Sequence, residues 1–229
     1  MCGRFSITLS LDMIVERFGC QPADFQFAPR YNVAPTQQVP VVVKREGLKQ
    51  LQVMRWGLVP FWSKEPSIGS RLINARLETI REKPAFKNAL PRRRCIVPAD
   101  GYFEWLKTAQ GKTPMRIVQE SGDCFGMAGL WDAWEDEQGN CLTTFTIITT
   151  EPVEPIRYIH NRMPLVLTRE AEKVWLDGPA QPGPTGWTEF LASLRCEAGL
   201  EAYQISNLVN SPIHDVPEVI EKVSPNTNS

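Results

Sequence analysis

Metal ligands of the usual kinds are scarce in this 229-residue sequence, which has two histidines and six scattered cysteines. No two cysteines form a Cys-x-x-Cys pair, so the common zinc spacings are absent, and we expect neither a metal nor a cofactor. Apart from Cys2, we interpret the cysteines as buried or free thiols in a reducing compartment. They lie at positions 20, 95, 124, 141 and 196.

Long apolar runs are also missing. No stretch approaches the roughly 18 residues that a membrane-spanning helix needs, and no basic segment followed by an apolar core opens the chain. A content of 42% hydrophobic and 22% charged residues is typical of a soluble globular protein. We therefore expect a cytoplasmic monomer, nucleoid-associated if bacterial, with one domain over residues 1–223 and a frayed tail over 224–229.

Charge is nearly balanced overall, at −1, but it is unevenly distributed. Residues 44–116 hold 16 Lys or Arg against 6 Asp or Glu, whereas the remainder holds 9 against 20. Basic side chains scattered over a solvated surface would give the same count. The consecutive Arg92, Arg93 and Arg94, with aromatic residues nearby, favour a face that binds a polyanion.

Short β-branched and aromatic runs bounded by Gly, Pro and acidic turns dominate the chain and predict strands. Apolar stripes after Ser, Thr or Pro predict a few short helices. Strands are expected at 39–44, 51–59, 95–97, 102–106, 115–119, 125–133 and 143–149, and helices at 10–18, 84–90, 153–159, 168–176 and 187–195. Without βαβ alternation, this order predicts an α+β fold whose mostly antiparallel sheets curl into a barrel-like core with short peripheral helices.

The first residues offer unusual chemistry. Aminopeptidases usually remove an initiator methionine before a small residue, so removal of Met1 would leave Cys2 with a free α-amine beside its thiol. The amine can condense with an aldehyde to an imine, and the thiol can then close on the imine carbon to give a thiazolidine. From these residues alone, an incidental cysteine at a frayed terminus is an equally good interpretation.

Three further positions could carry chemistry. Asn74 and Arg76 share a face if their segment is extended, although a lone Asn commonly binds its own backbone. Strand alternation places Glu104 with Tyr102 on one face, and a carboxyl group among aromatic residues is partly desolvated, which suits proton exchange near neutrality. His160 follows a predicted helix and could be a proton shuttle or a structural residue.

Tryptophans near the basic stretch provide large π surfaces. Trp56 lies inside an alternating strand, which predicts a place in the core. Trp62 and Trp105 lie beside irregular segments and could stack on unpaired bases, a contact worth roughly 1 to 3 kcal/mol each.

Six motifs follow one another along the chain: Met1-Cys2-Gly3-Arg4-Phe5, residues 31–37, Trp56-Gly57-Leu58-Val59-Pro60, Ile73-Asn74-Ala75-Arg76, residues 94–105, and Ile159-His160-Asn161-Arg162-Met163-Pro164. Together they resemble one known family, the SOS response-associated peptidase (SRAP) family. The resemblance covers residues 2 to about 170, in the family's order. Asn161 departs from the family pattern, which leaves the tuning of its neighbour His160 open.

The resemblance implies an enzyme that captures abasic sites in single-stranded DNA as a covalent thiazolidine on Cys2, shielding the lesion during the DNA damage response. Glu104 would move protons during opening of the deoxyribose ring, Asn74 would position the N-terminal residue, and His160 would handle protons at the imine. Strand cleavage by an AP lyase reaction and self-removal of Met1 are implied side activities. The implied DNA contacts are Arg4, Arg76 and Arg162 on phosphates, with Pro40 and Trp105 near the bases. Trp62 joins them as a candidate for base stacking from the sequence pattern alone.

Two other classes of function compete with this interpretation. Glutamine amidotransferase domains also begin Met-Cys-Gly, which would make Cys2 the thiolate nucleophile of an amidohydrolase. Such domains usually carry an Asn-Gly pair for the oxyanion hole, and the sequence has no Asn-Gly dipeptide. A non-catalytic module that binds single strands would leave Cys2, Glu104 and His160 without a role.

Overall fold

The computed structural model describes residues 2–178, 186–194 and 199–223. The tail predicted at 224–229 and Cys196 lie outside these ranges. Helices α1 to α4 are Leu11–Phe18, Pro84–Lys87, Arg169–Asp177 and Gly186–Ser193. Strands β1 to β13 are Phe5–Ile7, Arg30–Val33, Gln38–Arg45, Leu48–Trp56, Asn74–Arg76, Arg94–Ala99, Gly101–Thr108, Gly111–Gln119, Phe125–Glu135, Cys141–Thr150, Met163–Pro164, Val166–Leu167 and Leu200–Gln204.

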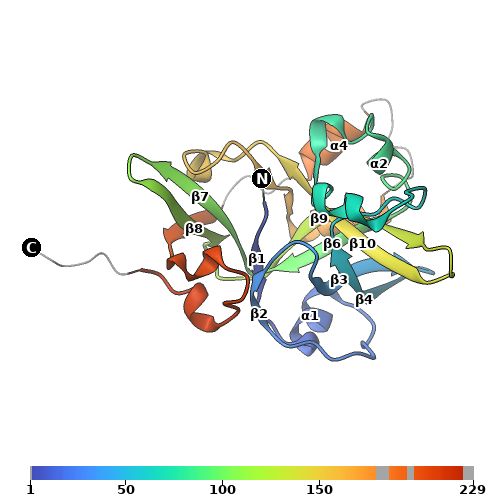
Figure 1. The fold of residues 1–229 in the computed structure, drawn as a ribbon, viewed down its shortest axis with the longest axis horizontal. Coiled ribbons are helices and arrows are strands. Elements are labelled where there is room, and N and C mark those ends of the chain that lie inside the picture. The colour runs from blue at the N-terminus through green and yellow to red at the C-terminus, as the bar shows by residue number, and fades with distance from the viewer. Residues whose placement is uncertain (1, 179–185, 195–198, 224–229) are drawn as a thin grey trace, which may run out of the picture.

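Five strands close into a ring, in the order β10, β4, β3, β6, β9 and back to β10. The β10–β4 pair is parallel and the other four pairs of the ring are antiparallel. Strands β5, β11 and β12 extend the same sheet. The predicted α+β fold with a barrel-like core and short peripheral helices is therefore confirmed (Figure 1).

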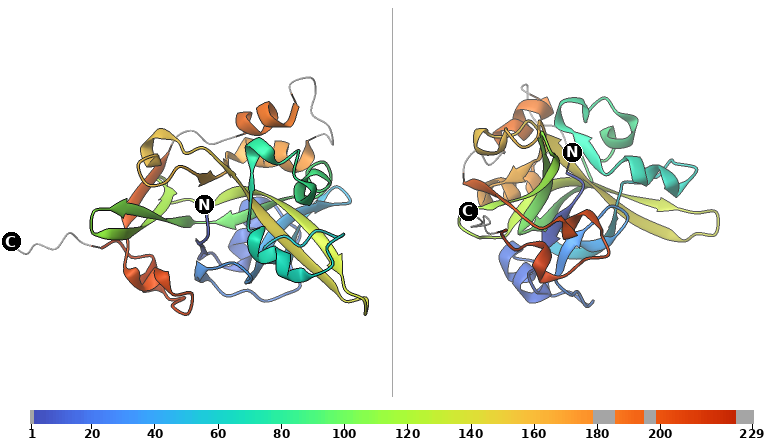
Figure 2. Two further views of the ribbon diagram at one scale, coloured as in Figure 1. Left: turned by 45° about the horizontal axis from the view of Figure 1, so that its top comes forward. Right: turned by 60° about the vertical axis from the view of Figure 1, so that its left-hand side comes forward.

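A second sheet carries the start of the chain. Its order is β13-β8-β7-β1-β2, so β1 has a partner on each side. Figures 1 and 2 show β1 between the long β7–β8 hairpin and the barrel strands. This arrangement holds the residues from Cys2 onward inside the molecule, in contrast to a frayed terminus.

Trp56 joins the two sheets through the core. It is fully buried, as predicted, and its ring packs edge-on against Phe5 of β1 at 5.1 Å and stacks with Phe145 of β10 at 6.3 Å. Its indole nitrogen donates a hydrogen bond to the Ile73 carbonyl, one residue before β5. One side chain thus links β1, β4 and β10 to the segment that leads to Asn74, and such aromatic contacts are worth about 0.5 to 1.5 kcal/mol beyond burial.

The helix predictions succeeded where caps were visible. The Ser10 side chain accepts the Met13 N–H, Gly19 ends α1 in the left-handed region, and Thr168 caps α3. The helix predicted at 153–159 is wrong: only Glu154–Ile156 form a 3-10 turn. Helix α2 is a single turn, shorter than predicted. Among the described residues, no helix is long and apolar enough to cross a membrane.

The strand predictions missed six elements, which are β1, β2, β5, β11, β12 and β13. Residues 30–33 are not among the predicted strands, but they pair with β1. All six strands are short, with two to five residues each, and are defined by their partners. Local alternation over so few residues carries little signal.

The consecutive arginines do not form a free basic face. Arg94 donates to the Gly178 carbonyl and lies over the rings of Trp175 and Trp187. Arg93 forms an ion pair with Asp132. Only Arg92 of the three is exposed, so this run offers a phosphate backbone less free guanidinium surface than the sequence suggests.

Gly57 offers a test of the packing that supports the loop after β4. Its φ is +121°, and an added Cβ would lie 2.6 Å from the Gly69 carbonyl oxygen. We expect Gly57→Ala to lower the free energy of unfolding by about 2 kcal/mol more than Gly111→Ala, measured by urea denaturation. Gly111 is the matched control, because its φ is +130° and no atom lies within 4 Å of its added Cβ. Equal losses would contradict the close-packing argument.

Candidate active site

Cys2 lies just before β1 and is fully buried. Burial raises the pKa of its thiol to about 12, and the nearby Glu104 carboxylate contributes to this rise. The thiol donates a weak hydrogen bond to the Arg4 carbonyl at 3.9 Å. At neutral pH the thiol is therefore neutral, and the few per cent of thiolate that an exposed cysteine would carry is not available.

Asn74 holds Cys2 through the backbone. Its Nδ2 donates to the Cys2 carbonyl at 2.8 Å. Strand β5, which pairs in parallel with β10, buries Ala75 and turns Asn74 and Arg76 to the opposite face, as predicted. The Asn74 Oδ1 is buried and has no hydrogen-bond partner within the described ranges. This acceptor is available to a donor on the N-terminal residue.

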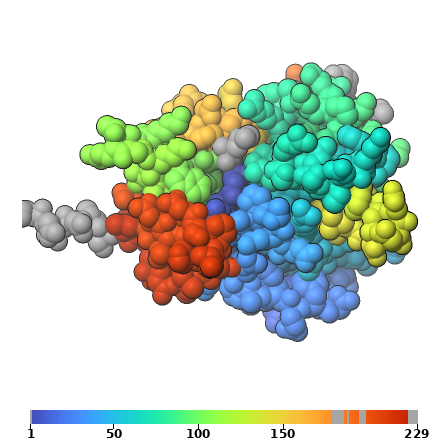
Figure 3. All heavy atoms as spheres, viewed as in Figure 1, coloured from blue at the N-terminus to red at the C-terminus, as the bar shows by residue number. Residues whose placement is uncertain are grey.

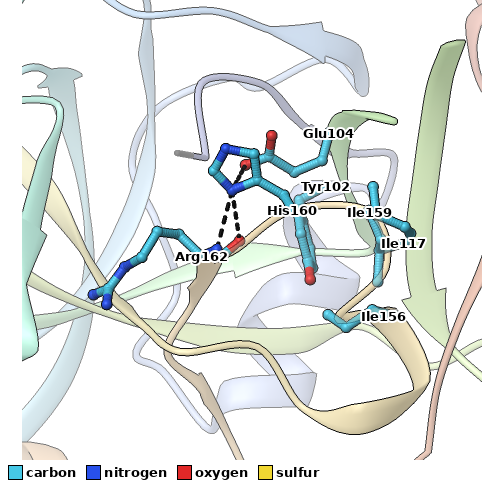
Figure 4. A pocket seen from close by; sticks show the side chains of 7 residues that line it. All are labelled: Tyr102, Glu104, Ile117, Ile156, Ile159, His160 and Arg162. Carbon is cyan, nitrogen blue, oxygen red and sulfur yellow. Dashed lines mark hydrogen bonds and ion pairs between the residues drawn. The ribbon is translucent and has the colours of Figure 1, made fainter. Parts of the chain in front are cut away.

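Glu104 and His160 meet beside Cys2. The Glu104 side chain, from β7, is 6% exposed, and its Oε1 lies 3.9 Å from Nδ1 of His160, which is 30% exposed (Figure 4). The backbone N–H of Arg162 donates to the same Nδ1 at 3.0 Å. In the neutral ring the proton is therefore on Nε2, and a protonated ring would present Nδ1–H to the Glu104 carboxylate and the Arg162 carbonyl.

These two residues line a small pocket. Tyr102 also lines it, on the same face of β7 as Glu104, which confirms the predicted alternation. Burial raises the pKa of the Tyr102 hydroxyl well above its ordinary value, so this group stays neutral. The remaining lining residues are Ile117, Ile156, Ile159 and Arg162. Figure 3 shows the dark-blue start of the chain in a recess between larger surface segments.

The Arg4 guanidinium makes hydrogen bonds within the protein that its sequence position does not predict. Its Nη1 donates to Asn32 Oδ1 at 2.8 Å and to the Val209 carbonyl. Burial lowers the pKa of Arg4, and its Nε is buried without a partner in the described part of the chain. The Asn32 amide in turn donates to the carbonyls of Ser211 and His214. Arg4 thus ties β1 to the segment after β13.

Arg162 already has an anionic partner. Its two Nη atoms bind the two carboxylate oxygens of Glu78 at 2.8 and 3.0 Å. Figure 4 shows its guanidinium extending away from the His160 ring. Arg76, by contrast, is exposed. Sequence reasoning missed both Glu78 and Asn32, and the only local hint of Glu78 is its place two residues after Arg76.

The three residues expected near DNA bases have different surroundings. Pro40 is buried within β3 and offers little surface. Trp105 is half-buried, and its indole donates to the Asn210 side chain at 2.8 Å. Trp62 is 47% exposed in the loop after β4, which matches the predicted open tryptophan.

The fold and this cluster define a class of β-rich protein that encloses an N-terminal cysteine with an amide, a carboxylate and an imidazole. The family model for SOS response associated peptidase (SRAP) matches residues 1–212. Abasic site processing protein YoqW of Bacillus subtilis is 43% identical over 224 residues, covering 96% of this chain and 99% of that protein. Abasic site processing protein HMCES of Gallus gallus is 32% identical, over 96% and 77% of the two chains.

A solved structure agrees with these relatives. A crystal structure of a Bacteroides thetaiotaomicron protein superposes with a TM-score of 0.86 at 31% identity, covering 97% of this chain and all of that one. The chain belongs to the SRAP family.

Thiol alkylation tests the burial of Cys2. In folded protein at pH 8, we expect iodoacetamide to modify the exposed Cys141 and to leave Cys2 and Cys95 unmodified, because burial raises the pKa of both of these thiols. Peptide mass spectrometry would follow each site. Denatured protein is the control, in which all three should react at similar rates. Labelling of Cys2 as fast as Cys141 in the folded state would contradict the enclosed site.

Proposed function

We propose that this protein, once Met1 is removed, captures abasic sites in single-stranded DNA as a covalent thiazolidine on Cys2. The observation that carries the proposal is the hydrogen bond from the Asn74 side chain to the Cys2 carbonyl. The Asn74 amide oxygen has no partner in the described part of the chain, and Glu104 and His160 lie close to each other in the same site. The abasic site processing relatives named above support the choice of substrate.

Removal of Met1 converts the Cys2 backbone nitrogen into an α-amine. Its nitrogen attacks C1′ of the open deoxyribose, and loss of water gives the imine. The Cys2 sulfur then bonds to C1′, and the thiol proton moves to the nitrogen. Aldehyde, amine and thiol become thiazolidine and water, with no oxidant or reductant. The product lacks a C=N bond, so it outlasts a Schiff base.

Glu104 and His160 supply the proton transfers. An abasic deoxyribose exists mostly as a ring, and opening it requires a base at the 1′-hydroxyl and an acid at the ring oxygen. Two groups whose nearest polar atoms lie 3.9 Å apart can divide these tasks, and the Asn74 Oδ1 can accept a hydrogen bond from the amine. If the imine loses a proton from C2′ before the thiol closes, the C3′–O bond breaks by β-elimination and the 3′-phosphate leaves, which would be an AP lyase reaction.

The neutral Cys2 thiol favours a reaction in which the amine attacks before the thiol, over the thiolate-first reaction of an amidohydrolase. An N-terminal-nucleophile amidohydrolase attacks first with its thiolate, and a thiol with a pKa of about 12 resists that ionisation. In the imine route the amine attacks first, and the thiol adds afterwards to an activated carbon. The peptidase activity in the family name would then be removal of Met1 by the same groups.

Several side chains would hold the strand. Arg76 is exposed and free to contact a phosphate, and Trp62 offers a half-exposed ring for stacking. Arg4 would reach a phosphate only through the N–H groups not bound to Asn32 and Val209. Arg162 and Trp105 would first have to exchange their present partners.

Cys2→Ala separates the two bond-forming steps. We expect wild type and an abasic single-stranded oligonucleotide to give a heat-stable shifted band on a denaturing gel. The Cys2→Ala variant keeps the α-amine but lacks the thiol, so its adduct should appear only after borohydride reduction. Intact mass verifies removal of Met1 in both proteins. A heat-stable band from Cys2→Ala without reductant would contradict the thiazolidine.

Glu104→Gln tests proton transfer with little change of shape. We expect the crosslinking rate at pH 7 to fall by about 100-fold. Binding of undamaged single-stranded DNA, measured by fluorescence anisotropy, should change less than about twofold, because Glu104 is buried beside the sugar site. An unchanged crosslinking rate would remove Glu104 from the mechanism.

A further inference from the structure

Glu78 is paired with Arg162, one of the arginines expected to bind a DNA phosphate. It lies in a 3-10 turn over Leu77–Thr79, directly after the strand that carries Asn74 and Arg76. Both of its carboxylate oxygens face the two Nη atoms of Arg162, in the fork geometry that a phosphate also adopts on arginine. The Arg162 Nη2 also donates to the Thr149 carbonyl at 2.6 Å.

Arg162 and Glu78 differ in how firmly their side chains are held. The Arg162 side chain is 12% exposed and is fixed by Thr149, whereas the Glu78 side chain is 44% exposed. Burial raises the pKa of Glu78, but the hydrogen bond from Arg162 and the charges of Arg162 and Arg76 outweigh it and hold the pKa below its ordinary value. Glu78 is thus ionised at neutral pH. A carboxylate this exposed can rotate into solvent and leave the guanidinium in place.

We propose that Glu78 sets the affinity for DNA by acting as a built-in anion on Arg162, which a backbone phosphate must displace. This inference rests on the proposed binding of single-stranded DNA and adds a residue that selects against undamaged strands. Arg76, Arg162 and Glu78, which we call the anchor, together carry one net positive charge. The anchor therefore attracts a phosphate less strongly than the two arginines would without Glu78. Reversible binding to intact DNA is weakened, whereas capture of an abasic site is completed by covalent bonds.

Salt dependence distinguishes this role from a structural one. Each phosphate that a protein neutralises on a single strand contributes about 0.7 to the slope of log K against log salt. If Glu78 competes with phosphate, removing its charge adds one unit of positive charge to the anchor and steepens the slope. If Glu78 only orients Arg162, its loss weakens binding and leaves the slope equal or shallower.

The experiment compares wild type with Glu78→Gln on undamaged single-stranded oligothymidylate, by fluorescence anisotropy over a range of salt concentrations. We expect Glu78→Gln to bind about two- to fivefold more tightly at low salt, with a slope steeper by about 0.7. Glu82→Gln is the matched control, since it removes the same charge from an exposed site four residues further on and should shift binding less. Thermal unfolding checks that all three proteins are folded.

The outcomes separate this inference from the proposed function, because a parallel gel follows heat-stable crosslinking of an abasic oligonucleotide by wild type. Unchanged or weaker binding by Glu78→Gln overturns the inference, and crosslinking by wild type then leaves the proposed function standing. Tighter binding with a steeper slope supports the inference even if wild type fails to crosslink. An equal gain for Glu82→Gln overturns it, because the effect would then be one of general charge.

Discussion

The pairing of β1 on both sides is the constraint on which the site depends. A three-residue strand at the start of a chain would fray, but β1 lies between β2 and β7, and Phe5 packs on Trp56. Because β7 also carries Glu104, the same pairing that fixes Cys2 fixes the carboxylate beside it. The reactive terminus is therefore positioned by the sheet, not by its own local structure.

Enclosure then determines the chemistry. Burial keeps the Cys2 thiol and the Tyr102 hydroxyl neutral by raising the pKa of each, because both would lose solvation as anions. The site thus presents an uncharged thiol and an uncharged phenol next to a carboxylate and an imidazole. Such a site suits condensation with an aldehyde, in which protons move but no free thiolate is needed.

The cations around the site are mostly engaged within the protein. Arg94 lies between two tryptophan rings, Arg93 pairs with Asp132, and Arg4 binds Asn32 and Val209. A count of charges along the chain cannot reveal this, since partners such as Arg4 and Val209 are 205 residues apart. The basic excess of residues 44–116 therefore overstates the surface available to a phosphate backbone.

The α+β class, the barrel strands, the caps of α1 and α3, and the family could be predicted from the amino-acid sequence alone. These features rest on local alternation, cap residues and short motifs that are recognised without knowing any partner. Three features became visible only in the folded chain: β1 and β2 form strands, the segment after Val153 is a single turn, and Glu78 pairs with Arg162. Those outcomes depend on long-range pairs, whose energy no local window contains.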